Sequence, residues 1–197
     1  MILWFHIFCR EICRIILRLV WRFRSVGSER IPATGPVIVA ANHVSYLDPV
    51  VLGSGMSRPL TYLAKKELFA IPVLGPLIAA LGAKPLDRQA GGVTAVRAAL
   101  RVLKEGHCVG IFPEGTRNLD GSAPEKGGAA LLAALSGAVV VPAGIVGTRD
   151  ARRLHQIRIA YGEPLRVVRD RKADGDDLEK WTVEIMQRIR ALEESIR

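Results

Sequence analysis

His43 and Asp48 are the two residues of this sequence whose types and spacing most directly suggest acid–base chemistry. They lie five positions apart in residues 42–48, NHVSYLD, which we call the His43 segment. If the histidine follows a strand and the aspartate begins the next helix, the carboxylate can accept a hydrogen bond from one imidazole nitrogen. The other nitrogen is then free to take a proton, as in a general base, which typically contributes about 10²–10⁴-fold to a rate. A structural alternative also exists, because Asp48 followed by Pro49 suits a helix cap.

No protein nucleophile accompanies this pair. Ser45 is only two residues from His43, the chain has no Gly-x-Ser-x-Gly sequence, and Cys108 falls inside a predicted buried strand. A histidine base without a nucleophile indicates activation of a substrate hydroxyl for direct attack on an acyl donor. Hydrolysis, in which water takes the place of that hydroxyl, is the closest alternative reaction.

A second candidate segment comprises residues 112–117, FPEGTR, which we call the Arg117 segment. Gly115 permits a tight backbone turn, and the planar guanidinium of Arg117 suits a phosphate. Thr116 can add a hydroxyl or backbone donor, and Glu114 can orient the arginine or hold a substrate hydroxyl. A surface turn with a local Glu–Arg pair is the simpler interpretation. A predicted strand that runs directly into the segment favours an anion site.

The remaining pattern predicts the elements that position these residues. Short apolar runs predict strands at residues 36–41, 60–64, 107–112 and 139–145, and an alternating pattern predicts a later strand at residues 156–161. Helical spacing predicts helices at residues 93–105, 127–135 and 174–196, with short helical pieces within residues 71–81. Strands that alternate with helices predict a single α/β domain, with a mixed, largely parallel central sheet flanked by helices. Because functional residues gather at the carboxyl ends of such strands, His43, Glu114 and Pro142 are expected to share one edge.

An amphipathic helix is predicted for residues 1–26, ahead of a catalytic domain formed by residues 27–197. Its arginines recur every four residues, at Arg10, Arg14, Arg18 and Arg22, and the rest of the helix is densely apolar. A transmembrane span is disfavoured, because each arginine at mid-helix depth would cost about 2.5–3.5 kcal/mol. A signal peptide is disfavoured because no uninterrupted apolar core or cleavage site is present.

We therefore expect the N-terminal helix to lie in a membrane interface. The arginine side, which also carries His6 and Glu11, is expected to face lipid phosphates, and the apolar side to enter the acyl region. An ordinary amphipathic helix packed on the domain is the alternative. Both interpretations hold if the helix is shared between domain and membrane.

Composition narrows the possible partners. The chain has 197 residues, of which 49% are hydrophobic, and a formal net charge of +9. That charge predicts an anionic partner, either a membrane or a nucleic acid. The sequence has no lysine-rich tail, aromatic-interleaved basic motif or zinc-finger spacing, so a nucleic-acid partner is disfavoured.

The three cysteines, Cys9, Cys13 and Cys108, form no disulfide framework. We expect reduced thiols in a cytoplasmic compartment. A zinc site built from His6, Cys9 and Cys13 lacks a fourth ligand.

In their order and spacing, the His43 and Arg117 segments resemble the glycerolipid acyltransferase family. Residues 82–88, GAKPLDR, and residues 140–145, VVPAGI, are similar to two further sequence blocks of that family. The resemblance covers roughly residues 25–165. Two departures concern the acceptor: Lys84-Pro85 stands where a bulky apolar residue is usual, and Asn118 stands where serine is usual.

The resemblance implies roles for individual residues. His43 is implied to deprotonate the acceptor hydroxyl, with Asp48 as its partner. The strand around Pro142 is implied to line the donor side or to support the site. The site for the acceptor's phosphate is implied to comprise Glu114, Gly115, Thr116, Arg117 and Arg88.

The implied reaction moves a fatty acyl chain from an acyl thioester to the free hydroxyl of 1-acyl-glycerol-3-phosphate, which forms phosphatidic acid for phospholipid biosynthesis. Acyl-CoA or acyl-acyl carrier protein would be the co-substrate, with no further cofactor and no metal. The expected location is the cytoplasmic face of the cell membrane, as a peripheral or monotopic protein. Three alternatives stay open: another acceptor, such as a lyso-ornithine lipid or another lysophospholipid; a thioesterase; and a membrane-binding protein without catalysis.

Overall fold

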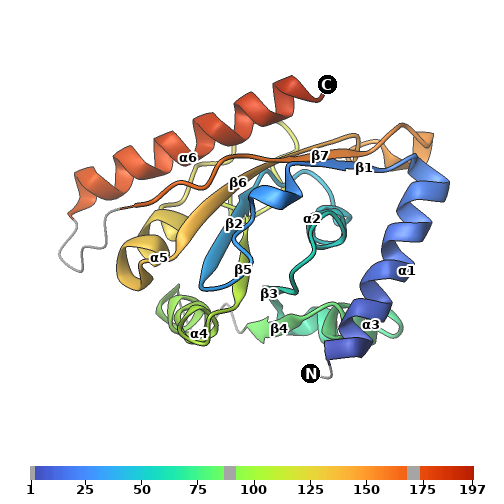
Figure 1. The fold of residues 1–197 in the computed structure, drawn as a ribbon, viewed down its shortest axis with the longest axis horizontal. Coiled ribbons are helices and arrows are strands. Elements are labelled where there is room, and N and C mark those ends of the chain that lie inside the picture. Colours follow the sequence, from blue (N-terminus) through green and yellow to red (C-terminus); the bar gives the residue numbers. More distant parts are fainter. Residues whose placement is uncertain (1–2, 87–91, 168–173) are drawn as a thin grey trace.

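A central sheet organises the computed structural model, which describes residues 3–86, 92–167 and 174–197 (Figure 1). In the described part of the chain its strand order is β1-β7-β6-β2-β5-β3-β4. All neighbouring strands are parallel except β6 and β7, so the predicted mixed, largely parallel sheet is confirmed. The strands are β1 (Arg24–Val26), β2 (Val37–Ala41), β3 (Leu60–Lys65), β4 (Ala83–Leu86), β5 (Cys108–Ile111), β6 (Val139–Val146) and β7 (Arg158–Tyr161).

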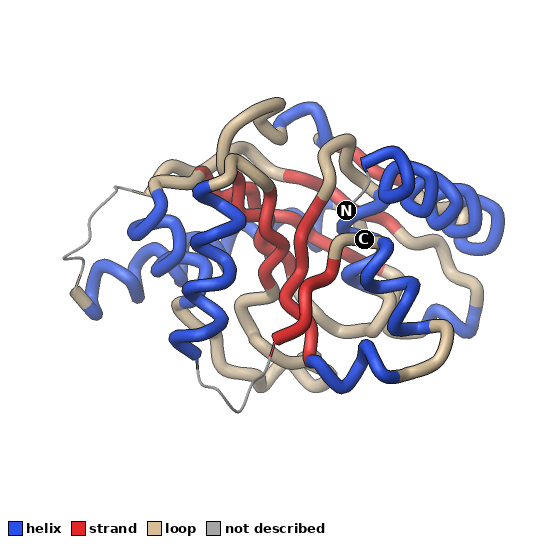
Figure 2. Tube along the Cα trace, turned by 90° about the horizontal axis from the view of Figure 1, so that it is seen from below, coloured by secondary structure: helices blue, strands red, loops and turns tan. Residues whose placement is uncertain are grey.

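Helices cover both faces of this sheet (Figure 2). One face packs against α1 and α2, and the other against α4, α5 and α6. The helices are α1 (Leu3–Trp21), α2 (Asp48–Ser54), α3 (Leu74–Ala80), α4 (Gly92–Lys104), α5 (Gly128–Ser136) and α6 (Gly175–Ser195).

Strand β2 lies at the centre of the sheet and is buried on both faces. Its odd-numbered residues pack in the core beside α1 and α2, whereas its even-numbered residues pack beside α4, α5 and α6. This is the period of two that a strand imposes on its side chains. The alternation continues past the end of β2, so that Asn42 reaches α6 while His43 reaches α2.

The predicted strands and helices agree with those observed to within a few residues, whereas two edge strands were not predicted. Strand β1 has three residues and β4 has four. Neither shows the apolar run of a buried strand, and β4 contains Pro85, which cannot donate to a strand ladder. An edge position tolerates such a proline because one side of the strand needs no partner.

The arginine side of α1 faces the domain at two of its positions. Arg14 donates to the carbonyl oxygens of Ser54, at 2.7 Å, and Met56, at 3.0 Å. Arg10 is buried and donates to the carbonyl oxygen of Ser57. The expected orientation toward lipid phosphates is therefore wrong for Arg10 and Arg14. The physical reason is that carbonyls at and beyond the end of α2 lack partners within their own helix and need external donors.

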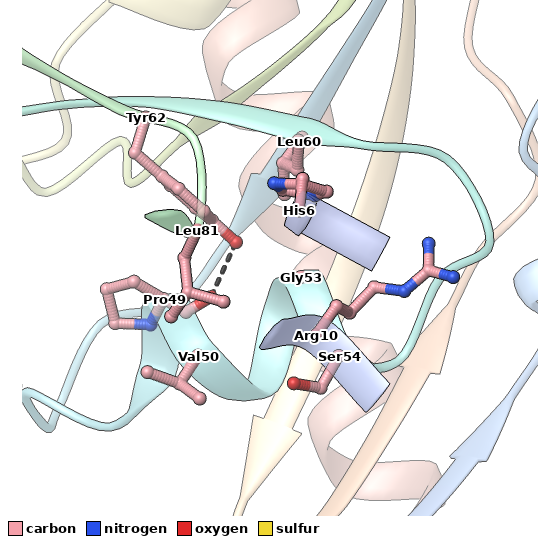
Figure 3. Close-up of a pocket in the computed structure, with 9 residues that line it drawn as sticks. All are labelled: His6, Arg10, Pro49, Val50, Gly53, Ser54, Leu60, Tyr62 and Leu81. Carbon is pink, nitrogen blue, oxygen red and sulfur yellow. Dashed lines mark hydrogen bonds between the residues drawn. The ribbon is translucent and has the colours of Figure 1, made fainter. Parts of the chain in front are cut away.

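His6, on the arginine side of α1, joins this helix to α3. Its Nδ1 lies 3.2 Å from the carbonyl oxygen of Ala80, and burial lowers the pKa of the imidazole. A cavity of about 10 Å³, large enough for a single water molecule, lies between His6 and Tyr62 (Figure 3). No group of His, Cys, Asp and Glu side chains among the described residues is arranged to hold a metal ion.

The outward side of α1 is apolar. Leu19, at 80% exposed, is the most open of its large apolar side chains. Over the ranges that the structure describes, no helix has both the length and the apolarity to cross a membrane. The exposed large apolar residues of α1 are Trp4, Phe5, Ile7, Phe8, Ile12, Ile15, Ile16, Leu19 and Val20.

Replacing Arg14 with alanine is expected to lower the free energy of unfolding by about 1.5–3 kcal/mol, because the substitution removes a charged donor shared by two carbonyls. Arg18 is the matched control, since it is exposed on the same helix and Arg18→Ala should change stability by less than about 0.5 kcal/mol. Urea denaturation followed by circular dichroism measures both values. Equal effects of the two substitutions would contradict the inward orientation.

Candidate active site

The carboxylate of Asp48 organises the turn that follows β2. Asp48 is completely buried, and its Oδ2 accepts three hydrogen bonds. They come from Nδ1 of His43 at 3.0 Å and from the backbone N–H groups of Val44 and Ser45, each at 2.7 Å. The predicted contact between His43 and Asp48 is therefore confirmed. Asp48 is not a helix cap, because its carboxylate binds groups that precede it and Leu47 occupies the cap position.

The imidazole of His43 is held on two sides. One side is the Asp48 carboxylate, which fixes the tautomer: an ionised carboxylate only accepts, so Nδ1 carries the proton and Nε2 is the free base. The second is the ring of Phe112, which stacks on the imidazole with centroids 4.2 Å apart and an interplanar angle of 22°. The His43 side chain is 16% exposed, so the imidazole is mostly buried but still accessible to a substrate.

Contacts of backbone and side chain join the His43 segment to the Arg117 segment and to Asn118, which follows it. Strands β2 and β5 pair in parallel, with Ala40 opposite Ile111, so both segments emerge at the same edge of the sheet. Beyond the strands, the N–H of Asn118 donates to the carbonyl oxygen of His43 at 2.7 Å. The Phe112–His43 stack is a further contact. Another joins two side chains: the Arg117 guanidinium carbon lies 3.8 Å from the centroid of the Tyr46 ring.

The Arg117 segment forms a tight turn. Gly115 has a φ of +66°, a left-handed conformation, and its N–H donates to the carbonyl oxygen of Phe112 at 2.9 Å. A Cβ at Gly115 would lie 3.0 Å from the exposed side chain of Lys126, which can move aside, so the left-handed φ is the main reason for glycine here. Thr116 is exposed and Arg117 is half-buried, which leaves both at the surface of the turn.

Glu114 does not orient Arg117, which corrects one of its two predicted roles. Among the described residues no ion pair joins the two side chains. Glu114 is instead buried beside the backbone of His43 and the side chain of Asn118, and its Oε2 has no partner there. Burial raises the pKa of this carboxyl, against the hydrogen bonds that favour the ionised form. A hydroxyl-binding role for Glu114 stays a prediction.

Asn42 and Glu193 are two residues of the site region that the sequence did not single out. Asn42 is buried, and its amide pairs with both backbone groups of Ile145, accepting from N–H at 2.8 Å and donating to the carbonyl oxygen at 2.9 Å. It also donates to Oε1 of Glu193 on α6 at 2.9 Å. The only signal for Asn42 is its position next to His43, and Glu193 carries none within a long polar-faced helix.

Glu193 lines an open cleft of about 530 Å³ on the α6 side of the strand ends. Burial raises the pKa of its carboxyl to about 7, and the nearby acids Glu114 and Asp48 add to that rise, whereas Arg197 opposes it. Glu114 and Asn42 line the same cleft. The carboxyl therefore titrates well above the usual range of a glutamate.

Arg88 and Pro142 are the other two residues that the sequence assigned to the site. Arg88 lies outside the described residues, so its phosphate-binding role stays a prediction. Pro142 lies within β6, opposite Ala40 of β2, and its carbonyl oxygen accepts from the N–H of Gly162 at 2.8 Å. Pro142 is buried, and in this position it supports the strand beside the site.

Comparison with known proteins gives consistent matches. A family model described as Acyltransferase matches residues 22–146. The chain is 33% identical to the 1-acyl-sn-glycerol-3-phosphate acyltransferase of Bacillus subtilis, over 80% of this chain and 81% of that protein. The protein of the same description from Borreliella burgdorferi is 32% identical over 63% of this chain, and the match spans about half of that relative (51%).

A solved structure is also similar to this chain. It is described as the 1-acyl-sn-glycerophosphate (LPA) acyltransferase, PlsC, from Thermotoga maritima. It superposes with a TM-score of 0.71 and is 27% identical in sequence, covering 94% of this chain and 78% of that one. The similarity thus extends over the sheet, the helices and the segments that carry His43 and Arg117.

Replacing Glu193 with glutamine is expected to change how stability depends on pH. The unfolded chain releases this proton near pH 4.5, whereas the folded protein retains it until about pH 7, so wild-type stability falls as pH rises between these values. Glutamine keeps the oxygen that accepts from Asn42 but cannot titrate. The wild-type free energy of unfolding should therefore decrease relative to that of Glu193→Gln between about pH 4.5 and pH 7, in urea titrations. A difference that is constant with pH would contradict the assignment.

Proposed function

The chain belongs to the acyltransferase family, and we propose that it transfers a fatty acyl chain from an acyl thioester to the free hydroxyl of 1-acyl-glycerol-3-phosphate, forming phosphatidic acid. The observation that carries this proposal is the His43–Asp48 pair held at the same sheet edge as Arg117. A base and a guanidinium fork at the same sheet edge suit an acceptor that carries both a hydroxyl and a phosphate.

The reaction proposed for this geometry uses one base and no covalent enzyme intermediate. Nε2 of His43 takes the proton of the acceptor hydroxyl as the hydroxyl oxygen attacks the thioester carbonyl carbon. Asp48 stabilises the imidazolium that forms. The carbon–sulfur bond then breaks, and the leaving thiolate receives the proton from the imidazolium, which restores the base.

Cys108 does not suit a nucleophilic role. Its thiol is buried in β5, at 1% exposed, and burial raises its pKa to about 11. Ser45 belongs to the turn itself, because its backbone N–H binds Asp48 and its hydroxyl accepts from the N–H of Leu47. These positions support direct attack by the substrate hydroxyl.

Arg117 favours a phosphate-bearing acceptor over a neutral one. The half-buried guanidinium at this sheet edge would bind a lysophospholipid phosphate through two parallel N–H donors, and a phosphate-free acceptor would leave that charge unpaired. We propose acyl-CoA or an acyl carrier protein as donor, supported by the net charge of +9. Because a thioester is already activated, positioning and a base suffice without a cofactor.

A membrane surface is the proposed location of the reaction, with α1 lying on the lipid. The support is the apolar outward side of α1, described above, and an apolar segment around α3, which contacts α1. Within that segment Val73 is 82% exposed at a φ of +68°, a conformation that a β-branched residue rarely adopts. Exposed apolar side chains on two adjoining elements suit an interfacial helix and its neighbouring loop. The free thiols suit the cytoplasmic face.

Replacing His43 with alanine is expected to reduce acyl transfer by at least about 10²–10⁴-fold, because the general base is removed. The measurement uses purified protein in mixed micelles, both thioester donors and a panel of lyso-lipids, with products identified by mass. Circular dichroism and vesicle binding of the variant should match those of the wild type. Wild-type turnover by His43→Ala would refute the mechanism. Free fatty acid as the only product, with acceptor in excess, would instead identify a thioesterase.

Placing charges on the outward side of α1 is expected to weaken membrane binding. The double variant Phe8→Glu and Leu19→Glu removes two exposed apolar side chains, each worth about 1.5–3 kcal/mol when buried, so binding to anionic vesicles should fall more than about 10-fold. The double variant Val93→Glu and Val183→Glu is the matched control, since it adds the same charge at exposed apolar positions on α4 and α6. Sedimentation with vesicles measures both, and equal losses would contradict the proposed surface.

A further inference from the structure

The ring of Tyr46 contacts the guanidinium of Arg117, and Tyr46 belongs to the same turn as His43. We propose that Tyr46 is a positioning residue that holds the Arg117 guanidinium ready for the acceptor's phosphate; this inference rests on the function proposed above. Tyr46 belongs to the His43 segment, whereas Arg117 belongs to the other segment. Their contact, 3.8 Å from guanidinium carbon to ring centroid, is therefore a side-chain link between the two functional parts of the site.

The backbone that carries Tyr46 is firmly held. The residues on both sides of it are fixed: Ser45 donates its N–H to Asp48, the hydroxyl of Ser45 accepts from the N–H of Leu47, and the N–H of Asp48 returns to the carbonyl oxygen of Ser45. The same carboxylate that orients His43 thus also fixes the origin of the Tyr46 side chain. Because the backbone of Tyr46 is fixed, its ring can restrict the position of the Arg117 guanidinium that contacts it.

The exposure of Tyr46 argues against a role in the core. The residue is 73% exposed, and no core cluster of the described residues includes it. An exposed aromatic ring in a turn contributes little to packing. Its contact with a cation over the ring face is the interaction to which its position is suited.

The stacked arrangement leaves Arg117 able to bind a phosphate. The N–H donors of a guanidinium lie in its plane and point outward, and the guanidinium carbon of Arg117 lies over the Tyr46 ring, 3.8 Å from its centroid. Stacking therefore restricts the side-chain rotamers without using the fork that would bind two phosphate oxygens. A guanidinium that is already ordered loses less conformational entropy when the phosphate arrives.

The link also relates the two chemical groups in space. His43 and Tyr46 share one turn, so the separation between base and guanidinium is set by that turn and by one stacking contact. An acceptor with its hydroxyl and its phosphate on adjacent carbons of a glycerol unit presents both groups close together. Tyr46 would thereby favour acceptors of this short spacing.

The test compares three substitutions of Tyr46. Tyr46→Ala removes the ring, Tyr46→Leu keeps bulk without a π-face, and Tyr46→Phe keeps the π-face without the hydroxyl. A cation–π contact at an exposed site corresponds to roughly two- to five-fold in an equilibrium constant. We expect the alanine and leucine variants to raise KM for 1-acyl-glycerol-3-phosphate by about that factor with kcat nearly unchanged, and the phenylalanine variant to behave as wild type.

A double-mutant cycle with Arg117→Ala separates positioning from other roles. In that background Tyr46→Ala should have no further effect on KM, because the group it positions is gone. An additive effect would overturn the proposal, as would a wild-type KM in Tyr46→Ala and Tyr46→Leu.

Vesicle binding of the Tyr46 variants should equal that of the wild type, and a loss that tracks the rise in KM would make Tyr46 a lipid contact instead. Absence of transfer by the wild-type protein would refute the proposed function itself, whereas normal wild-type transfer with unaffected Tyr46 variants refutes this inference alone.

Discussion

The buried carboxylate of Asp48 is the constraint on which the site depends. A buried carboxylate is costly unless donors satisfy it. Here Oδ2 receives three hydrogen bonds, from an imidazole and two backbone N–H groups, whereas Oδ1 is buried without a partner among the described residues. Those donors come from residues immediately before Asp48, so satisfying the charge forces residues 43–48 into one turn. The tautomer of His43, the start of α2 and the direction in which Tyr46 leaves the backbone all follow from that turn.

The parallel pairing of β2 with β5 brings the second segment to the first. Register places the end of β5 beside the end of β2, and the bond from Asn118 to the carbonyl oxygen of His43 continues the contact where the ladder stops. The period of two in β2 then divides the side chains that follow it. His43 turns toward α2 and the base chemistry, whereas Asn42 turns toward α6 and ties Glu193 to β6.

Sequence reasoning succeeded where the signal is local. Short apolar runs predicted β2, β3, β5 and β6, helical spacing predicted α4, and the five-residue spacing of His43 and Asp48 predicted their contact. It failed where the orientation of a side chain depends on residues far away in the sequence. The inward turn of Arg14 follows from carbonyls at the end of α2, and the burial of Glu114 away from Arg117 follows from packing beside His43 and Asn118. Edge strands β1 and β4 gave no signal because their sequences need satisfy only one neighbour.

The packing of α1 against the domain has a consequence for how the rate of acyl transfer would depend on the lipid surface. Arg10 and Arg14 donate hydrogen bonds to carbonyls at and beyond the end of α2, and Leu17 is part of the core. Helix α1 is therefore an integral part of the domain. With its outward side on lipid, as proposed, the reaction centre would sit at a set height above the bilayer. Turnover would then follow the mole fraction of acceptor in the surface, so that diluting the acceptor with inert lipid would slow the enzyme even at constant bulk concentration.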